Sequence, residues 1–515
     1  MPITKNTFTI QQADFQKIID VDASDGRSVP INMNFVDEGY LTKDTGIELF
    51  GDAQASLLHS IFHYKKKNGT SFILAGSGTA LKVYNTGAGV WDTLAITGIA
   101  TFTAGAEFGF NVYDDILYAC NAVENYFRWD GTTSTNYAGA PKGNILQVFE
   151  DRMFVSGVTA EPLTAYYSNV GDAIVFTGTD LVKPLGTDAI TNLVNYYGTL
   201  LIFKADSIWK LTFIYDQIVT LFVPKLDSQS GTYGACSRKA VSWVENDLWF
   251  FTGREVRSIG FTDNVSGVFG VNRSVISENV KETLNRVKFA NFDKCVTFYE
   301  NRRFYLAVPI EGNVADTLFV CHNLYGNSWT KYTGRDKANI NDMIAIDEVI
   351  YSTKNSGTFG AIKWNSTLND ISTAISSEVF FKRIEDEDFN RFRTYRYWDL
   401  MFKDLVGSVT ITLRKEASDV SSDTDKTFAV GNSGSGEVLG EVAFGDALFG
   451  GGVGDATIFS PFIKKRISFL SKNQAFILGI ANSATDEEFT ICEMVLSGYE
   501  QPKGMFAGSK IISVR

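Results

Sequence analysis

The chain has 515 residues, of which 44% are hydrophobic and 13% are aromatic, so it is long enough for more than one domain with a large core. Its formal net charge of −12 argues against a nucleic-acid reader that holds phosphates through lysine and arginine clusters. Its five cysteines include no CxxC pair, which argues against a disulfide framework. The sequence contains no run of about 18 apolar residues, so we expect no membrane-spanning helix.

Residues 1–50 stand apart from the repeats that follow. They lack the basic and apolar parts of a secretory signal. Residues 29–35 predict a strand, and a glycine-containing turn leads to a second short strand. We expect this segment to add to a sheet elsewhere in the fold or to contact a partner subunit.

A hairpin signature recurs through residues 51–370. Its clearest copy, VSWVENDLWFFTGREVRSIGF at residues 241–261, has β-branched and aromatic runs on both sides of an acidic turn. The copies recur at intervals of about 40–50 residues, which is the period of propeller blades. Their turns centre on Asn68, Asp114, Glu150, Gly198, Glu245, Glu300 and Asp347.

A second mark follows in several copies, where an aromatic residue ends a strand and turn-forming residues come next. Such residues are expected where an outer strand of a blade reverses. The aromatic residues are Tyr84, Trp129, Tyr167 and Trp364. The sequence therefore predicts an all-β chain whose residues 51–370 form a six- or seven-bladed β-propeller, with Trp249 of the clearest copy buried.

One helix is predicted inside the repeats, at residues 277–284. Ile276, Val280 and Leu284 follow one another at four-residue intervals, and Ser277 is suited to cap the first turn. We expect this helix to lie on the propeller or to pack between subunits.

Residues 371–515 change in character and predict an appended β-sandwich-like domain with several alternating strands. A glycine-rich loop at residues 431–454 carries Phe444 and Phe449, which a plain linker would lack. The loop is either a flexible tip or an arm that orders against another chain. Its two phenylalanines join Ile276, Val280 and Leu284 as candidate subunit contacts.

The sequence has few of the residue patterns that catalysis or ligand binding requires. His59 and His63 have the spacing of a zincin helix, but the glutamate after the first histidine is missing and the segment is β-patterned. Carboxylate pairs such as Asp114-Asp115 fall in predicted turns. No GxSxG elbow or Walker A loop is present. We expect a non-enzyme with no catalytic, cofactor-binding or metal-binding residues.

Several segments in order resemble the tail-hub or nozzle family of short-tailed bacteriophages, which are also described as packaged-DNA-stabilisation proteins. The segments are PINMNF, GYLTKDTGIELF, DSIWKLTF, GTYGACSRKAV and NRSVISENVKETL, all within residues 25–290. The resemblance implies a ring, of six copies, at the distal end of a portal and adaptor tube. It also implies a DNA channel that is closed before infection.

The functional expectation is thus a virion tail protein made in the host cytoplasm. Its expected partners are further copies of itself, the phage adaptor or head-to-tail connector, and tail fibre or tail needle proteins. Double-stranded DNA would pass without sequence-specific binding. Two alternatives stay open: a propeller that binds or hydrolyses host-surface glycan, and a baseplate component of a long-tailed phage.

Overall fold

The computed structural model describes residues 4–8, 29–36, 40–216, 221–230, 232–263, 268–271, 275–310, 317–322, 328–335, 337–354, 360–364, 367–371, 373–381, 384–385, 393–415, 426–431, 462–473 and 475–500. Within these residues the chain is nearly all β and divides into two units. One unit comprises residues 46–327 and 332–367, and the other comprises residues 1–45, 328–331 and 368–515. We describe each by itself.

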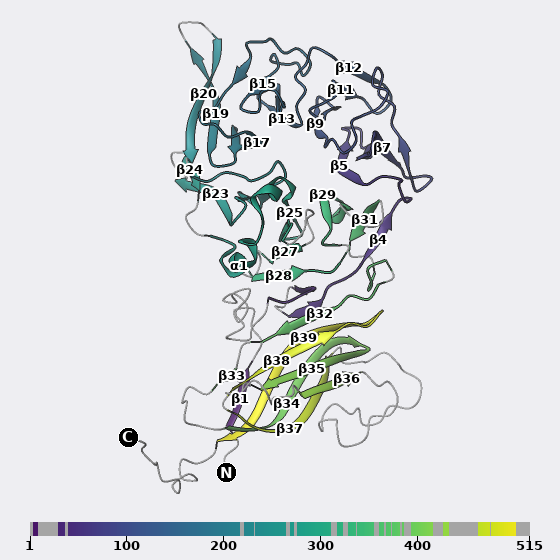
Figure 1. Cartoon of the computed structure of the whole chain (residues 1–515), viewed down its shortest axis with the longest axis vertical. Coiled ribbons are helices and arrows are strands. Elements are labelled where there is room, and N and C mark those ends of the chain that lie inside the picture. The colour runs from purple at the N-terminus through teal and green to yellow at the C-terminus, as the bar shows by residue number, and fades with distance from the viewer. Residues whose placement is uncertain are drawn as a thin grey trace. The chain divides into compact units, whose positions relative to one another are not determined.

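The first unit is a β-propeller with seven four-stranded antiparallel sheets among the described residues, arranged as blades around a centre (Figure 1). Blade 1 holds β5 (Leu58–Lys65), β6 (Ser71–Ser77), β7 (Ala80–Asn85) and β8 (Val90–Thr93). Blade 2 holds β9 (Gly109–Tyr113), β10 (Ile116–Cys120), β11 (Tyr126–Trp129) and β12 (Ser134–Tyr137). Blade 3 holds β13 (Ile145–Phe149), β14 (Arg152–Ser156), β15 (Ala165–Tyr167) and β16 (Leu181–Val182).

The remaining blades follow in chain order. Blade 4 holds β17 (Ile190–Tyr196), β18 (Thr199–Lys204), β19 (Ile208–Asp216) and β20 (Leu221–Ser230). Blade 5 holds β21 (Val241–Val244), β22 (Asp247–Phe251), β23 (Val256–Asp263) and β24 (Val268–Val271). Blade 6 holds β25 (Val296–Glu300), β26 (Arg303–Val308), β27 (Thr317–His322) and β28 (Ser328–Tyr332). Blade 7 holds β29 (Ile340–Ile346), β30 (Val349–Lys354) and β31 (Ala361–Trp364), and its outermost strand is β4 (Ile47–Phe50).

Blade 7 is completed by a strand from the N-terminal segment. Ile47 to Phe50 of β4 pair with Trp364 to Ala361 of β31, and Lys363 Nζ lies 2.9 Å from Glu48 Oε1. This pairing covers the outer edge of β31 and gives blade 7 the same four strands as the other blades. The expected propeller boundaries of 51–370 therefore move to about 46–367, and the segment expected at residues 1–50 is divided between the two units.

The repeated hairpins explain why the blades could be recognised. In blades 2 to 7, the first two strands of each blade are joined by two-residue turns. The second strand is largely buried, as in β18 and β22. Trp249 in β22 is buried. Five turn positions agree with the expected residues, whereas in blade 6 Glu300 pairs with Arg303, so the turn is Asn301-Arg302 and begins one residue later.

The hydrophobic core of the propeller lies between neighbouring blades. One cluster joins Val320 and Tyr305 of blade 6 to Trp364 and Ile47 of blade 7, which anchors the closing strand. Equivalent clusters lie between blades 1 and 2, 2 and 3, 3 and 4, and 7 and 1. Blades 1, 2, 3 and 7 therefore each have two apolar faces, which explains the aromatic-rich repeats.

The helical segment after β24 is shorter than expected. A 3-10 turn at Glu278–Val280 leads into a single α-helical turn, α1 (Lys281–Leu284), and a second 3-10 helix covers Phe289–Lys294. The Ser277 side chain makes no capping bond to this helix; its hydroxyl accepts a hydrogen bond of 2.9 Å from the Val256 backbone N–H. Ser277 thus fixes the helix to blade 5.

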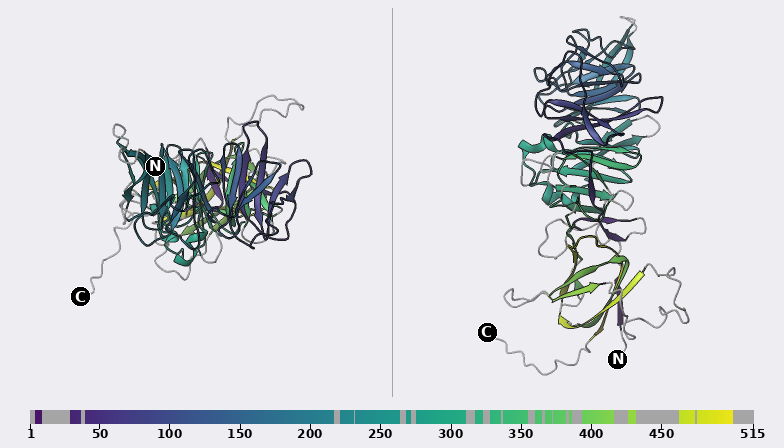
Figure 2. Two further views of the ribbon diagram at one scale, coloured as in Figure 1. Left: turned by 90° about the horizontal axis from the view of Figure 1, so that it is seen from above. Right: turned by 90° about the vertical axis from the view of Figure 1, so that its right-hand side faces the viewer.

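The second unit is a β-sandwich with strands from both ends of the chain. One sheet has the order β2 (Met33–Phe35), β3 (Leu41–Lys43), β39 (Glu488–Glu500), β34 (Arg393–Val406) and β37 (Phe462–Asn473), and β1 (Thr4–Phe8) pairs with β39. The other has the order β32 (Ser377–Phe380), β38 (Ala475–Asn482), β35 (Ser408–Lys415) and β36 (Lys426–Gly431), and β33 (Ile384–Glu385) pairs with β38. Figure 2 shows the strands from the C-terminal part of the chain in green and yellow and those from the N-terminal part in purple.

The sandwich strands alternate as a half-buried sheet requires. In β35, Val409 and Ile411 are buried while Ser408 and Thr410 are exposed. The N-terminal strands are held by a buried ammonium group, since Lys43 Nζ donates to Asn482 Oδ1 at 2.6 Å and to the Ala484 carbonyl at 3.2 Å. The domain expected at residues 371–515 therefore also needs residues 1–45. No helix in the described part of the chain is long and apolar enough to cross a membrane.

Candidate functional site at the centre of the propeller

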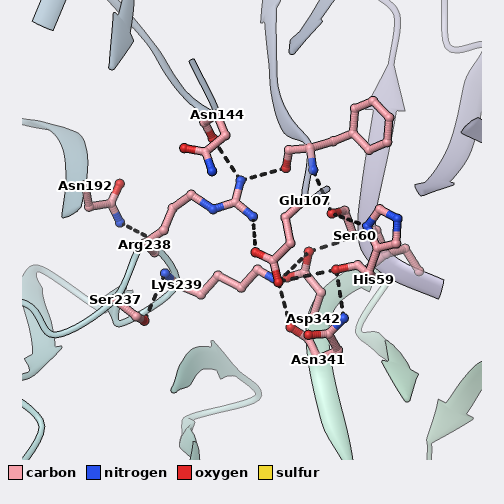
Figure 3. A network of polar contacts seen from close by, with 12 residues as sticks. His59, Ser60, Glu107, Asn144, Asn192, Ser237, Arg238, Lys239, Asn341 and Asp342 are labelled. Carbon is pink, nitrogen blue, oxygen red and sulfur yellow. Dashed lines mark hydrogen bonds and ion pairs between the residues drawn. The ribbon is translucent and has the colours of Figure 1, made fainter. Parts of the chain in front are cut away.

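Two consecutive cations, Arg238 and Lys239, occupy the centre of the propeller (Figure 3). They lie in the loop that leads from β20 to β21, immediately before the inner strand of blade 5. Their side chains reach residues at the starts of the inner strands of other blades. The dipeptide therefore joins blade 5 to blades that are far from it in the sequence.

Arg238 reaches blades 2 and 3. Its Nη1 donates to the backbone carbonyls of Phe108 at 2.7 Å and Asn144 at 2.9 Å, and its Nη2 lies 2.6 Å from Oε2 of Glu107. A guanidinium group with several donors in one plane suits such a junction, because one side chain satisfies several acceptors at once. The Arg238 carbonyl in turn accepts a bond of 2.7 Å from Asn192 Nδ2 of blade 4.

Lys239 reaches blades 7 and 1. Its Nζ donates to the Asn341 carbonyl at 2.8 Å and to the His59 carbonyl at 3.4 Å. The same ammonium group lies 3.2 Å from Glu107 Oε1 and 3.8 Å from Asp342 Oδ2. Together, Arg238 and Lys239 contact all six other blades, because the Lys239 carbonyl also accepts a hydrogen bond of 2.7 Å from the Thr297 N–H of blade 6.

The inner strands of three blades are bulged where they meet this cluster. The antiparallel registers of β5, β17 and β29 each shift by one residue, at His59, Thr191 and Asn341. A bulge leaves the extra residue outside the ladder. The carbonyls of His59 and Asn341 are thereby available to Lys239, and Asn341 Nδ2 also donates to the His59 carbonyl at 3.0 Å.

The charges of the cluster are nearly balanced, but the carboxylates differ. Burial alone raises the pKa of Glu107, but Lys239 and Arg238 outweigh it and hold the pKa at about 2. Burial raises the pKa of Asp342 despite the same two cations. Glu107 is therefore the firmly ionised partner of both cations.

His59 is the neutral member of the group. Burial and the nearby Lys239 lower the pKa of His59 and Glu107 raises it, with a net pKa of about 4. Its Nδ1 lies 3.3 Å from the Ser60 hydroxyl, whereas its buried Nε2 has no hydrogen-bond partner among the described residues. His59 and His63 both lie in β5, and no group of three or more metal-ligating side chains occurs among the described residues.

Side-chain hydrogen bonds also join the inner strands of several pairs of neighbouring blades. Ser60 Oγ accepts from the Phe108 N–H, Asn111 Nδ2 donates to the Leu146 carbonyl, and Asp342 Oδ2 accepts from the Ile61 N–H, at 3.0 to 3.1 Å. The Ser242 and Thr297 hydroxyls are 2.8 Å apart between blades 5 and 6. These hydrogen bonds and ion pairs hold the blades in a fixed ring.

The residues expected to contact subunits lie elsewhere. Val280 and Leu284 are fully buried, and Ile276 is partly buried with its N–H bonded to the Val256 carbonyl at 3.0 Å. Their apolar face packs within the chain, which corrects the expectation of a surface contact. Phe444 and Phe449, and the loop that carries them, lie outside the described residues.

Sequence reasoning did not single out Arg238, Lys239 or Glu107. The available signal was an Arg-Lys pair inside the small-residue segment ACSRKAV, directly before an inner strand. Polar pairs at the starts of other inner strands, His59-Ser60 and Asn341-Asp342, were a second signal. The local sequence could not predict that Glu107 would pair with these cations, because the two segments meet only in the folded propeller.

Comparisons with known proteins identify no family for this chain. No protein-family model matches the chain, and no curated protein matches it in sequence. Similar solved structures include the extracellular domains of two hybrid two-component systems of B. thetaiotaomicron, with 11% and 9% identity and TM-scores of 0.39 and 0.43. These matches cover 71% and 77% of this chain, which spans only 45% and 56% of those chains.

The WD40 domain of Neurospora crassa Pan2 is also similar, with 9% identity and a TM-score of 0.36 over 65% of this chain and 98% of that chain. At this level, the likenesses carry no inference about function.

Proposed function

We propose that this chain is a structural subunit of a short-tailed phage particle, a ring-forming tail nozzle that closes the DNA channel and conducts DNA during ejection. The observation that carries the proposal is the position of Arg238 and Lys239. They belong to the GTYGACSRKAV segment on which the resemblance rests, and they join blade 5 to the six other blades.

The other segments of the resemblance also fall at joints of the fold. GYLTKDTGIELF contains β3 of the sandwich and β4, the strand that closes blade 7. In PINMNF, Ile31 exchanges backbone hydrogen bonds of 2.8 and 3.1 Å with Glu378. The segment NRSVISENVKETL contains Ser277, which bonds to β23. The resemblance therefore concerns residues that build the architecture, which supports a shared structural role.

A crosslinked centre also bears on where DNA would pass. The middle of this propeller is crossed by side chains from opposite blades, so the propeller serves as a rigid block. A DNA passage would then lie between copies of the chain in a ring. The net charge of −12 suits such a passage, because a wall rich in lysine and arginine would hold the phosphates and slow ejection.

Localisation in particles tests the proposal. Gold-labelled antibodies raised against the purified chain are applied to phage particles that encode it, and electron microscopy records the label. We expect label at the distal end of a short tail, and DNA leakage from particles that lack the protein. Label on fibres or on a long-tail baseplate would overturn the proposal, as would absence from particles together with binding of the purified chain to a glycan array.

A further inference from the structure

Two free cysteines meet where the chain enters neighbouring blades. Cys236 lies in the loop before β21 of blade 5, and Cys295 directly precedes β25 of blade 6. Their thiols are in hydrogen-bond contact with each other. The backbone of each residue is anchored, since the Cys236 N–H donates to the Phe251 carbonyl at 3.0 Å and the Cys295 N–H donates to the Phe292 carbonyl at 3.2 Å.

Hydrogen bonds hold the two cysteine-bearing segments in register. Ser237 Oγ donates to the Cys295 carbonyl at 2.5 Å, and the Thr297 N–H donates to the Lys239 carbonyl at 2.7 Å. The residues of each pair are 58 positions apart, so the two segments run side by side in the same direction. The contact between the thiols is therefore part of a fixed junction between blades 5 and 6.

The two cysteines differ in their access to solvent. Cys295 is fully buried, whereas Cys236 is partly exposed, so a small reagent reaches Cys236 first. Burial raises the pKa of the Cys236 thiol, and its hydrogen bond with Cys295 raises that pKa further. Because the thiolate is the reactive form, the pair persists as two thiols in reducing surroundings and reacts slowly at neutral pH.

We propose that Cys236 and Cys295 form a site of oxidative modification, at which a low-molecular-weight disulfide converts the two thiols into a disulfide bond between blades 5 and 6. The Cys236 thiolate attacks one sulfur of the reagent and displaces the other half as a thiol. The Cys295 thiolate then attacks the Cys236 sulfur and displaces the second half. The protein gives up two electrons and two protons, and the reagent takes them up as two thiols.

The bond would fasten the central dipeptide of the propeller. It closes a loop that contains all of blade 5, from β21 to β24, and Cys236 lies two positions before Arg238. A crosslink of this kind restricts the unfolded chain and so stabilises the folded one. Reducing surroundings keep the junction open to exchange, and oxidising surroundings lock it. The inference does not depend on the proposed tail function.

Peptide mapping of the full chain tests the site. The chain is purified with a reductant, freed of it and incubated with oxidised glutathione at about pH 8.5, where more of the thiol is ionised. Remaining thiols are blocked with iodoacetamide before digestion with trypsin. We expect peptides 226–238 and 295–302 to appear as one linked species that lacks two hydrogen atoms. The melting temperature should rise by about 2–5 °C, and dithiothreitol should reverse both changes.

Cys236→Ser and Cys295→Ser should each abolish the linked species and the thermal shift. Cys321→Ser is the matched control, since it changes a buried thiol in β27 of blade 6 and should leave both intact. The proposal is overturned if both peptides carry blocked thiols after oxidation, or if Cys236 remains joined to glutathione. It is also overturned if the link joins two copies of the chain, seen as a dimer on a non-reducing gel, or if it forms only in urea.

Discussion

Nη2 of Arg238 lies 2.6 Å from Oε2 of Glu107, although 131 positions separate the two residues in the chain. The contact spans the centre of the propeller from blade 5 to the start of blade 2. It therefore forms only when blades 2 and 5 are packed around the same centre, and its loss reports on that packing.

Replacing Glu107 with glutamine removes the charge that Arg238 and Lys239 share. We expect the free energy of unfolding to fall by about 2 kcal/mol, below the range for fully buried pairs because the Glu107 side chain is 36% exposed. Urea denaturation measures the change. The control is Glu161→Gln, whose partner Lys183 is 3.2 Å away in an exposed pair and whose removal should cost less than about 1 kcal/mol. Equal effects of the two substitutions would show that the central network contributes no special stability.

Lowering the pH should destabilise the propeller through His59. The pKa of its imidazole is about 4 in the folded chain and near 6.5 when unfolded, so the unfolded chain binds the extra proton between these values. Stability is therefore full above pH 6.5 and is lost as the pH falls towards 4, by up to about 3 kcal/mol. Urea denaturation at pH 7, 6, 5 and 4 measures the slope.

His59→Gln should flatten this pH dependence. His63→Gln should flatten it less, because His63 is only partly buried, although burial lowers its pKa as well. A slope that is unchanged in His59→Gln would mean that other groups account for the acid sensitivity.

The short helix should behave as core. Leu284→Ala removes a fully buried side chain and should lower the free energy of unfolding by about 2–5 kcal/mol. Phe289→Ser, five positions later, changes a side chain that is 80% exposed and should have an effect near zero on the isolated chain. Thermal melts of the two variants decide the matter, and a neutral Leu284→Ala would return the helix to the list of subunit contacts.

Two fragments test the closing strand. Residues 46–367 retain β4, so this fragment should unfold cooperatively, whereas residues 51–367 lack it and expose the edge of β31 and the apolar side chains that pack on Ile47. We expect the shorter fragment to aggregate or to lose its cooperative transition. Identical melting curves would show that β4 is dispensable for the ring.

Much of the architecture was predictable because short stretches of sequence encode each blade. An apolar run, a two-residue polar turn and a second apolar run recur with every blade, since each blade must bury both faces. The buried position of Trp249 follows from the same pattern. The number of blades could not be fixed because the degenerate copy at Asn68 and the split seventh blade lack the full signature.

Sequence reasoning missed the contacts between segments that are far apart in the sequence. β4 was grouped with residues 1–50 because nothing in four residues reveals a partner on the far side of the chain. Arg238 and Glu107 were overlooked for the same reason, since their meeting depends on ring closure. Val280 and Leu284 were interpreted as surface contacts because four-residue spacing marks an apolar face but does not show what covers it.

Blade 7 imposes an order on the folding of the propeller, because its outermost strand is made long before the strand that it pairs with. Glu48 and Lys363, which meet in its outer strand pair, are 315 positions apart. At translation rates of about 5–20 residues per second, β4 leaves the ribosome roughly 15–60 s before β31. For that interval the N-terminal strand has no partner, while blades 1 to 6 can already assemble beside it. The final step of propeller folding therefore joins residues 47–50 to residues 361–364, which leave the ribosome only after blades 1 to 6.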